Sequence, residues 1–243
     1  MTGILGEILS LSSAGFRIEE ARVGFFTTAV LSVSPEGRKY CGLASTLREG
    51  VCSGGIRPEL KLKGEDPLVI ARELIGGRGI EVSLSFASLN SCIPGAGFIE
   101  INAEEIIKLR GTGKKTAVIG HFPFTDRLYS CAGLLKVSDL SPKSEKDISP
   151  GEMEKFLPQA DVVALTALTL MNGTFERIIS LCKRDAFKVL LGPSSPMHPV
   201  LLKYLDCVCG TFVHDPAALL TDLSEGRNFR FLRGKKAVAI GRF

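Results

Sequence analysis

Short apolar runs alternate with amphipathic segments through the second half of the chain. The runs with the length and composition of buried strands are 116–120, 134–138, 162–165, 188–191, 207–213 and 237–240. The segments expected to be helices are about 125–132, 150–157, 173–183, 199–205 and 216–225. This alternation predicts a Rossmann-like α/β domain over residues 106–243, with helices on both faces of a mainly parallel sheet.

The first half of the chain has a different pattern. Residues 24–33 and 39–44 are rich in apolar and β-branched side chains, and the turn-forming segment 34–37 joins them, which predicts an antiparallel hairpin. The segments expected to be helices here are 4–11, 67–76 and 80–90, with a shorter helix from about 103 to 109. Residues 1–105 therefore read as a separate α+β domain, and the domain boundary is expected between about 100 and 115.

Polar residues follow the predicted parallel strands at the points where these strands end. They are Gly120 and His121, Asp139, Thr166, and the segment 192–195. Because the carboxyl ends of parallel strands meet at one edge of a sheet, we expect these residues to gather there and to form a ligand site.

The segment 161–174 is expected to form the centre of this site. A buried strand, 162–165, leads through a polar loop to Asn172, Gly173 and Thr174, where a helix is expected to open. A helix start at such an edge can hold an anionic group, and so can the turn at 192–195. Simpler interpretations stay open, because Asn172 is a favoured helix-capping residue, 192–196 is a tight turn, and His121 could cap the next helix.

The first strand–helix loop reads Gly-His-Phe-Pro-Phe from Gly120, so it lacks two glycines of a dinucleotide-binding fingerprint. Asp139 lies 19 residues beyond Gly120, where such folds often place an acid that binds a ribose. A dinucleotide is therefore disfavoured, while a mononucleotide-like or adenosyl ligand stays open.

Composition narrows the class of protein. Of 243 residues, 45% are hydrophobic and 23% charged, Trp is absent, and the net charge is only +4, which does not favour nucleic-acid binding. No apolar segment reaches the roughly 18 residues needed to cross a membrane, and no signal peptide is recognisable. The seven cysteines form no C-x-x-C pair, so we expect a reducing compartment, no disulfide framework and a cytoplasmic location.

Three sequence stretches carry a family resemblance. T-A-V-I-G-H-F-P-F from Thr116, the strand and loop from Leu157 to Thr174, and V-L-L-G-P-S-S-P-M from Val189 resemble the family called "putative heavy-metal chelation" proteins, whose function is unknown. The resemblance implies an enolase N-terminal-like domain followed by a Rossmann-like domain, with a ligand cleft between them. Two residues depart from the pattern, since Asp139 stands for a usual Glu and Ala167 for a common Gly.

The resemblance also implies ligand-binding residues. Those at matching positions are Gly120, His121, Phe122, Pro123, Thr166, Asn172, Gly173, Thr174, Gly192, Pro193 and Ser194. Asn90, in the amino-terminal domain, is expected to reach the same cleft.

These features lead to one main hypothesis and two alternatives. The main hypothesis is an enzyme that condenses or hydrolyses a pterin-, flavin- or chelator-like molecule, with His121 as the catalytic acid or base and Asp139 in the ligand site. The alternatives are a non-catalytic carrier of a metal or metal chelate, and an adenosyl-dependent methyltransferase-like protein. The sequence assigns no cofactor and no metal ligands, and the expected partners are a small molecule and a second copy of the chain.

Overall fold

A computed structural model describes residues 3–48, 56–95 and 97–243. It contains two sheets. The small sheet is antiparallel, in the order β1 (Arg17–Val23), β2 (Thr27–Val33), β3 (Lys39–Ser45). The large sheet has the order β5-β4-β6-β7-β8-β9, and its strands are β4 (Lys115–Ile119), β5 (Leu134–Ser138), β6 (Val162–Thr166), β7 (Phe187–Leu191), β8 (Cys207–Val213) and β9 (Lys235–Gly241).

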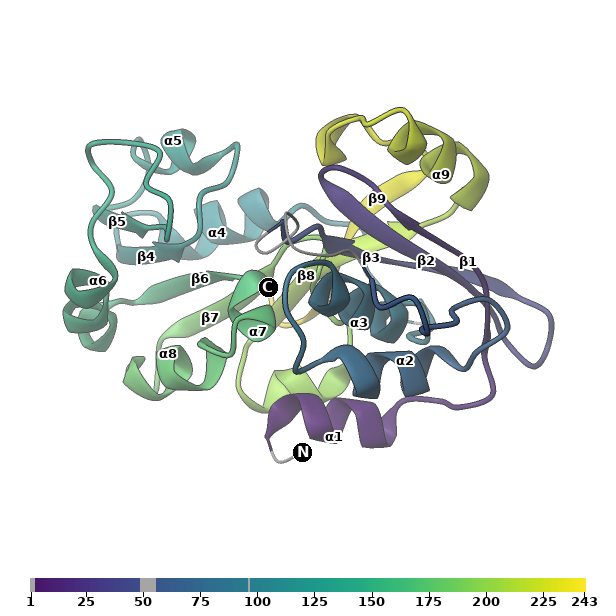
Figure 1. Cartoon of the computed structure of the whole chain (residues 1–243). Coiled ribbons are helices and arrows are strands. Elements are labelled where there is room, and N and C mark those ends of the chain that lie inside the picture. Colours follow the sequence, from purple (N-terminus) through teal and green to yellow (C-terminus); the bar gives the residue numbers. More distant parts are fainter. Residues whose placement is uncertain (1–2, 49–55, 96) are drawn as a thin grey trace.

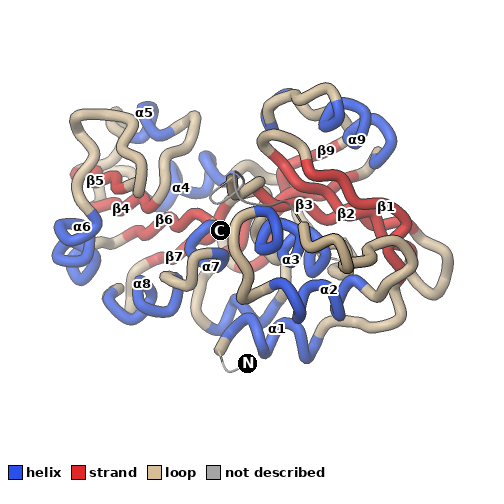
Figure 2. Tube along the Cα trace, viewed as in Figure 1, coloured by secondary structure: helices blue, strands red, loops and turns tan. Residues whose placement is uncertain are grey.

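Helices flank both sheets (Figure 1). The α-helices are α1 (Ile4–Leu11), α2 (Pro67–Leu74), α3 (Ile80–Asn90), α4 (Ala103–Gly111), α5 (Thr125–Leu128), α6 (Pro150–Phe156), α7 (Leu168–Met171), α8 (Phe175–Leu181) and α9 (Pro216–Ser224). The described residues also form the short 3₁₀ helices η2 (Leu157–Gln159), η3 (Pro199–Lys203) and η4 (Phe229–Phe231). In Figure 2 the strands of both sheets form a band across the middle of the molecule, with α1, α2, α3 and α8 below it and α5 and α9 above it.

The large sheet is mainly parallel, as the alternating pattern predicts. Only β9 runs antiparallel to its neighbour, β8. The chain passes from β4 to β5 on one side and then returns to β6 on the other side of β4. The strand order therefore reverses between β4 and β6, and this reversal is the position at which open α/β sheets bind ligands.

The apolar run at the centre of the large sheet is buried on both faces, as expected from its composition. Val162, Val163, Ala164 and Leu165 all have no exposed surface. The principal hydrophobic core includes side chains from both halves of the chain, so the two sheets share it.

The fold prediction is confirmed, because an antiparallel sheet with helices precedes a mainly parallel sheet. Strand β1 was not predicted, since its sequence R-I-E-E-A-R-V is charged and only Ile18 is fully buried. The helix expected to open at 172–174 begins at Phe175, because a separate turn of helix, α7, comes first. The segment 199–205 forms a 3₁₀ helix, η3, rather than an α-helix.

Several expected helix starts have the predicted caps. The Asp66 side chain accepts a hydrogen bond from Leu68 N, and Ser149 with Glu152 forms a complete capping box. The six cysteines within the described residues are free thiols. Within those residues we find no helix with both the length and the apolar character of a membrane span.

Candidate functional site

The point where the strand order reverses has a close backbone approach. Gly120, directly after β4, has a φ of 98°, which disfavours any residue with a side chain. A Cβ atom at this position would lie 2.8 Å from the Cβ of Thr166, at the end of β6. Two predicted site residues are thus in contact, and the contact requires glycine.

The next residue, His121, is held through its backbone. Its N–H donates to Oδ2 of Asp139, at 3.0 Å, and Oδ1 of the same carboxylate accepts from Ser141 N at 2.8 Å. Asp139 therefore joins the loops that follow β4 and β5. The half-buried His121 imidazole makes no hydrogen bond within the residues described.

Phe122 contributes an aromatic ring beside this loop. Its ring stacks on that of Phe124, with centroids 5.4 Å apart and an interplanar angle of 5°. Its backbone N–H donates to Thr125 Oγ1 at 2.9 Å. The structure therefore brings five predicted residues into one group, which we name the edge cluster: Gly120, His121, Phe122, Asp139 and Thr166.

Gly192 joins the end of β7 to the same edge. The Ala167 N–H donates to Leu191 O at 2.9 Å, and a Cβ at Gly192 would lie 3.9 Å from that of Ala167. Ala167 is almost fully buried. This position, at which the resemblance leads us to expect glycine, therefore belongs to the packed connection between β6 and β7.

The predicted residues Asn172, Gly173 and Thr174 form an exposed turn between α7 and α8. The Asn172 Oδ1 atom accepts from the backbone N–H of Thr174 at 3.1 Å and from its hydroxyl at 2.7 Å. These bonds close the turn locally and do not cap α8, because the N-cap position of α8 is Thr174. The following helix, α8, has only seven residues, and Thr174 at its start makes no side-chain cap.

Asn90 and Pro193, also predicted, lie elsewhere. Both line a pocket of about 70 Å³ between β3 and β8, whose lining includes no residue of the edge cluster. The hydroxyl of Ser194 is used structurally, since it accepts a hydrogen bond from Ser45 N at 2.8 Å. The predicted site residues thus divide among the edge cluster, the exposed turn, this pocket and the loop after β7, which holds Gly192 and Ser194.

Sequence reasoning missed several residues of the pocket. They include Cys41, Phe98 and Phe212, each half-buried. No local signal marks them, because β3 and β8 meet only through the packing of the two sheets. The pair Ser194 and Ser195 reads alike in sequence, yet only Ser195 lines the pocket.

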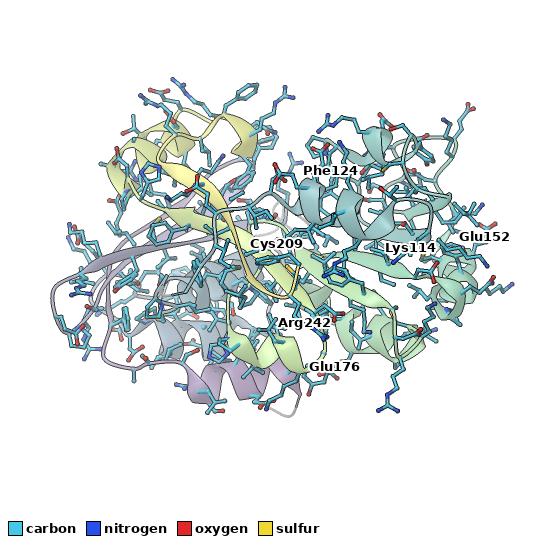
Figure 3. The ribbon with its side chains drawn as sticks, turned by 180° about the vertical axis from the view of Figure 1, so that it is seen from behind. Lys114, Phe124, Glu152, Glu176, Cys209 and Arg242 are labelled. Carbon is cyan, nitrogen blue, oxygen red and sulfur yellow. The ribbon has the colours of Figure 1, made fainter. Side chains whose placement is uncertain are left out.

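Metal-binding side chains were also sought. Within the described residues, no group of three or more His, Cys, Asp or Glu side chains is arranged to hold a metal ion. Cys207 and Cys209 lie in the core on β8, with their Sγ atoms 3.6 Å apart. Cys209 is labelled in Figure 3. The hydrogen bond with Cys207 and burial both raise the pKa of Cys209, which keeps this thiol protonated at neutral pH.

Family profiles match most of the chain. Residues 103–241 match one family and residues 7–93 match a second, and both carry the description "Putative heavy-metal chelation". An uncharacterized protein from Methanocaldococcus jannaschii is 24% identical over 182 residues, which cover 70% of this chain and 68% of the relative.

Two solved structures have the same fold across nearly the whole chain. Proteins of unknown function of the DUF364 family from Desulfitobacterium hafniense DCB-2 and Pyrococcus horikoshii align with TM-scores of 0.84 and 0.80. Each is 22% identical, and each alignment covers 98% of both chains. The chain belongs to the family described as "Putative heavy-metal chelation", whose members with solved structures share this two-sheet fold.

Proposed function

We propose that the protein binds a small organic molecule at the edge cluster and catalyses a condensation or hydrolysis on it, with His121 as general acid or base. The observation that carries this proposal is the arrangement of His121. Its backbone is fixed by Asp139 at the point of strand reversal, while its imidazole is half-buried and has no hydrogen-bond partner among the described residues. A histidine side chain whose ring nitrogens are free to meet a ligand suits the role of general acid or base.

The surroundings of His121 also fit an organic ligand. Gly120 lets the backbone approach β6 closely, and the Phe122 ring offers a flat apolar surface beside it. Thr166 adds a hydroxyl, whose oxygen accepts one hydrogen bond from Leu168 N at 3.3 Å and keeps its own proton for a ligand. Pterin-, flavin- and chelator-like molecules combine flat rings with polar edges, so they are the first compounds to test.

The experiment is a turnover assay on a panel of such compounds, followed by mass spectrometry. We expect one class of compound to be consumed, and we expect His121→Ala to slow its consumption by at least about 100-fold. The matched control is His214→Ala, because His214 is exposed and lies outside the edge cluster. Equal turnover by wild type and His121→Ala would reject the catalytic role.

A second candidate function is the carriage of a metal chelate, and the family description favours it. In this case the organic chelator would supply the metal ligands, and the edge cluster would bind the chelator. Elemental analysis of the purified protein distinguishes the two functions. Stoichiometric metal that is released together with an organic compound, without any turnover, would favour the carrier.

A further inference from the structure

The strands β3 and β8 belong to different sheets but lie next to each other. Their Cα atoms approach within 8 Å, although β3 pairs only with β2, and β8 only with β7 and β9. Directly paired antiparallel strands have Cα atoms about 4.5–5.5 Å apart. In Figure 2 the strands of the two sheets nevertheless lie in one band. We name the region between the facing edges of β3 and β8 the seam.

The β3 edge at the seam has free backbone groups. At the two ends of the β2–β3 pair, Ser34 N donates to Arg38 O and Thr46 N donates to Phe26 O. Because hydrogen-bonded pairs alternate in an antiparallel register, the odd-numbered residues of β3 direct their N–H and C=O groups away from β2. Cys41 therefore presents one donor and one acceptor to the seam, and no backbone partner is found for them in the described part of the chain.

The β8 edge is free for the same reason. His214 N donates to Gly234 O, so with the register of β8 and β9 the backbone groups of Thr211 and Val213 point away from β9. On that side β7 pairs with β8 only as far as Cys209. Thr211 and Val213 line the same pocket as Cys41, so the two free edges face one space.

Two side-chain atoms at this pocket also lack partners. The Oδ1 atom of Asn90 and the Oγ atom of Ser195 are buried and make no hydrogen bond to any described residue. Ser195 is only 3% exposed. The other end of the Asn90 amide is satisfied, since its Nδ2 donates to Leu43 O at 2.8 Å. Leaving a polar group buried without a partner is costly, so such atoms indicate a ligand or ordered water.

Among the described residues, the lining of the pocket carries no free charge. Lys39 is the one charged residue in this part of the lining, and its Nζ is paired with Glu19 Oε1 at 2.6 Å. Burial raises the pKa of Cys41 to about 12, so its thiol is neutral at neutral pH. Phe98 and Phe212 meet edge to face at 6.4 Å and form an aromatic wall.

We propose that the seam binds a small neutral molecule with a cyclic amide edge, in which an N–H lies beside a C=O. Such an edge carries the same donor and acceptor as a peptide unit, so it can pair with a free strand edge. Asn90 Oδ1 accepts from the ligand N–H, and the Ser195 hydroxyl donates to its C=O. The ligand C=O has a second lone pair, which accepts from the free backbone N–H of Cys41 or Thr211, so the ligand lies between β3 and β8.

The size of the pocket limits the ligand. A single water needs about 10–15 Å³ of cavity volume. The pocket of about 70 Å³ therefore holds about five waters or one six-membered ring. The inference therefore concerns a single lactam ring or a ring edge that enters from the open side. It stands independently of the function proposed for the edge cluster.

The test is a titration of isotope-labelled protein with α-pyridone, a planar six-membered lactam, followed by amide resonances. We expect saturable shifts at Cys41 and Thr211 and no saturable shifts with α-methoxypyridine, which lacks the amide edge. We expect Ser195→Ala to weaken α-pyridone binding about five- to tenfold, the effect of one lost neutral hydrogen bond.

The matched control is Ser88→Ala. Ser88 is also fully buried with an unpartnered hydroxyl, but it does not line the pocket, so its loss should leave the affinity unchanged. Thermal unfolding of both variants verifies that they fold. The inference is overturned if α-pyridone fails to saturate, if α-methoxypyridine binds equally well, or if Ser195→Ala binds like wild type. Since His121 is unaltered in both variants, none of these results would bear on the turnover assay.

Discussion

At the scale of single residues, Gly120 and Gly37 have similar backbone conformations in different surroundings. Both have positive φ values, 98° and 78°, but a Cβ at Gly37 would meet no atom within 4 Å. A Cβ at Gly120 would lie 2.8 Å from Thr166. Alanine substitutions at the two positions therefore separate the free-energy cost of the backbone conformation from the free-energy cost of the steric clash.

We therefore expect Gly120→Ala to lower the free energy of unfolding by about 2–4 kcal/mol, from the unfavourable φ and the clash together. Gly37→Ala should cost about 1–2 kcal/mol, from φ alone. Urea unfolding of both variants measures this difference. Equal losses in the two variants would mean that Gly120 and Thr166 are not in close contact.

The serines after β7 mark the limit of prediction from sequence at this scale. Ser194 and Ser195 follow the same strand and have the same chemistry, so the sequence treats them alike. Only the packing of β3 against this loop decides that Ser194 accepts from Ser45 N while the Ser195 hydroxyl stays without a partner. In contrast, Gly120 and Asp139 were identified because their distance from strand ends has a local signature.

At the scale of elements, the sequence predicts a strand where burial leaves a local pattern of apolar residues, and it misses a strand where that pattern is absent. Strand β6 is a continuous apolar run, because it is buried on both faces. Strand β1 lies at the edge of the small sheet and carries Glu19, Glu20 and Arg22. Its sequence therefore lacks the alternation of apolar and polar residues that predicts a strand. The meeting of β3 with β8 has no local signature at all, since neither strand pairs with the other.

The packing of β3 on α3 depends on another glycine. A Cβ at Gly42 would lie 2.1 Å from Ala87 O and 2.2 Å from Ser91 N, both in or next to α3. We expect Gly42→Ala to lower the free energy of unfolding by about 3 kcal/mol, because rigid backbone must move. Gly76→Ala is the control, since nothing lies within 4 Å of that position. A Gly42→Ala variant as stable as the control would contradict this packing in the chemical denaturation experiment.

Helix α9 is tied to the end of the chain by Asp222, whose side chain is fully buried from solvent. Its carboxylate accepts from the backbone N–H of Arg233 at 2.8 Å and from the guanidinium Nη2 at 2.7 Å. The hydrogen bonds from Arg233 lower the pKa of Asp222 to about 2. The stabilisation is therefore complete above the ordinary Asp pKa of 3.8 and is lost as the pH falls toward 2.

We expect wild-type stability to decrease between about pH 4 and pH 2 through this group, and we expect Asp222→Asn to lack that part of the decrease. The measurement is the urea midpoint as a function of pH for both proteins. If the two curves ran parallel through this range, Asp222 would not be the titrating group.

At the scale of the whole molecule, the two halves are joined too closely to be independent. The main core cluster takes residues from both, and Glu176 Oε1 accepts from Ile4 N at the start of α1 (Figure 3). Helix α9 packs on both sheets, through Ala29 and Leu31 of β2 and Val213 of β8. The division at residue 105 stays a prediction about sequence units.

We expect the chain to unfold in a single cooperative transition. Two buried cysteines report on the two halves, Cys92 next to α3 and Cys207 on β8. Their alkylation in increasing urea, read by mass spectrometry, should show the same midpoint. Reaction of Cys92 at clearly lower urea would show that the amino-terminal half opens alone.

The proposed function depends on an organic ligand at the edge cluster. A native mass spectrum of wild type and of His121→Ala, each incubated with the same small-molecule extract of cells, tests for this ligand. We expect an organic mass on wild type that is released on mild denaturation and is reduced in His121→Ala. Bare protein in both spectra, or a directly held metal ion with no organic mass, would contradict it.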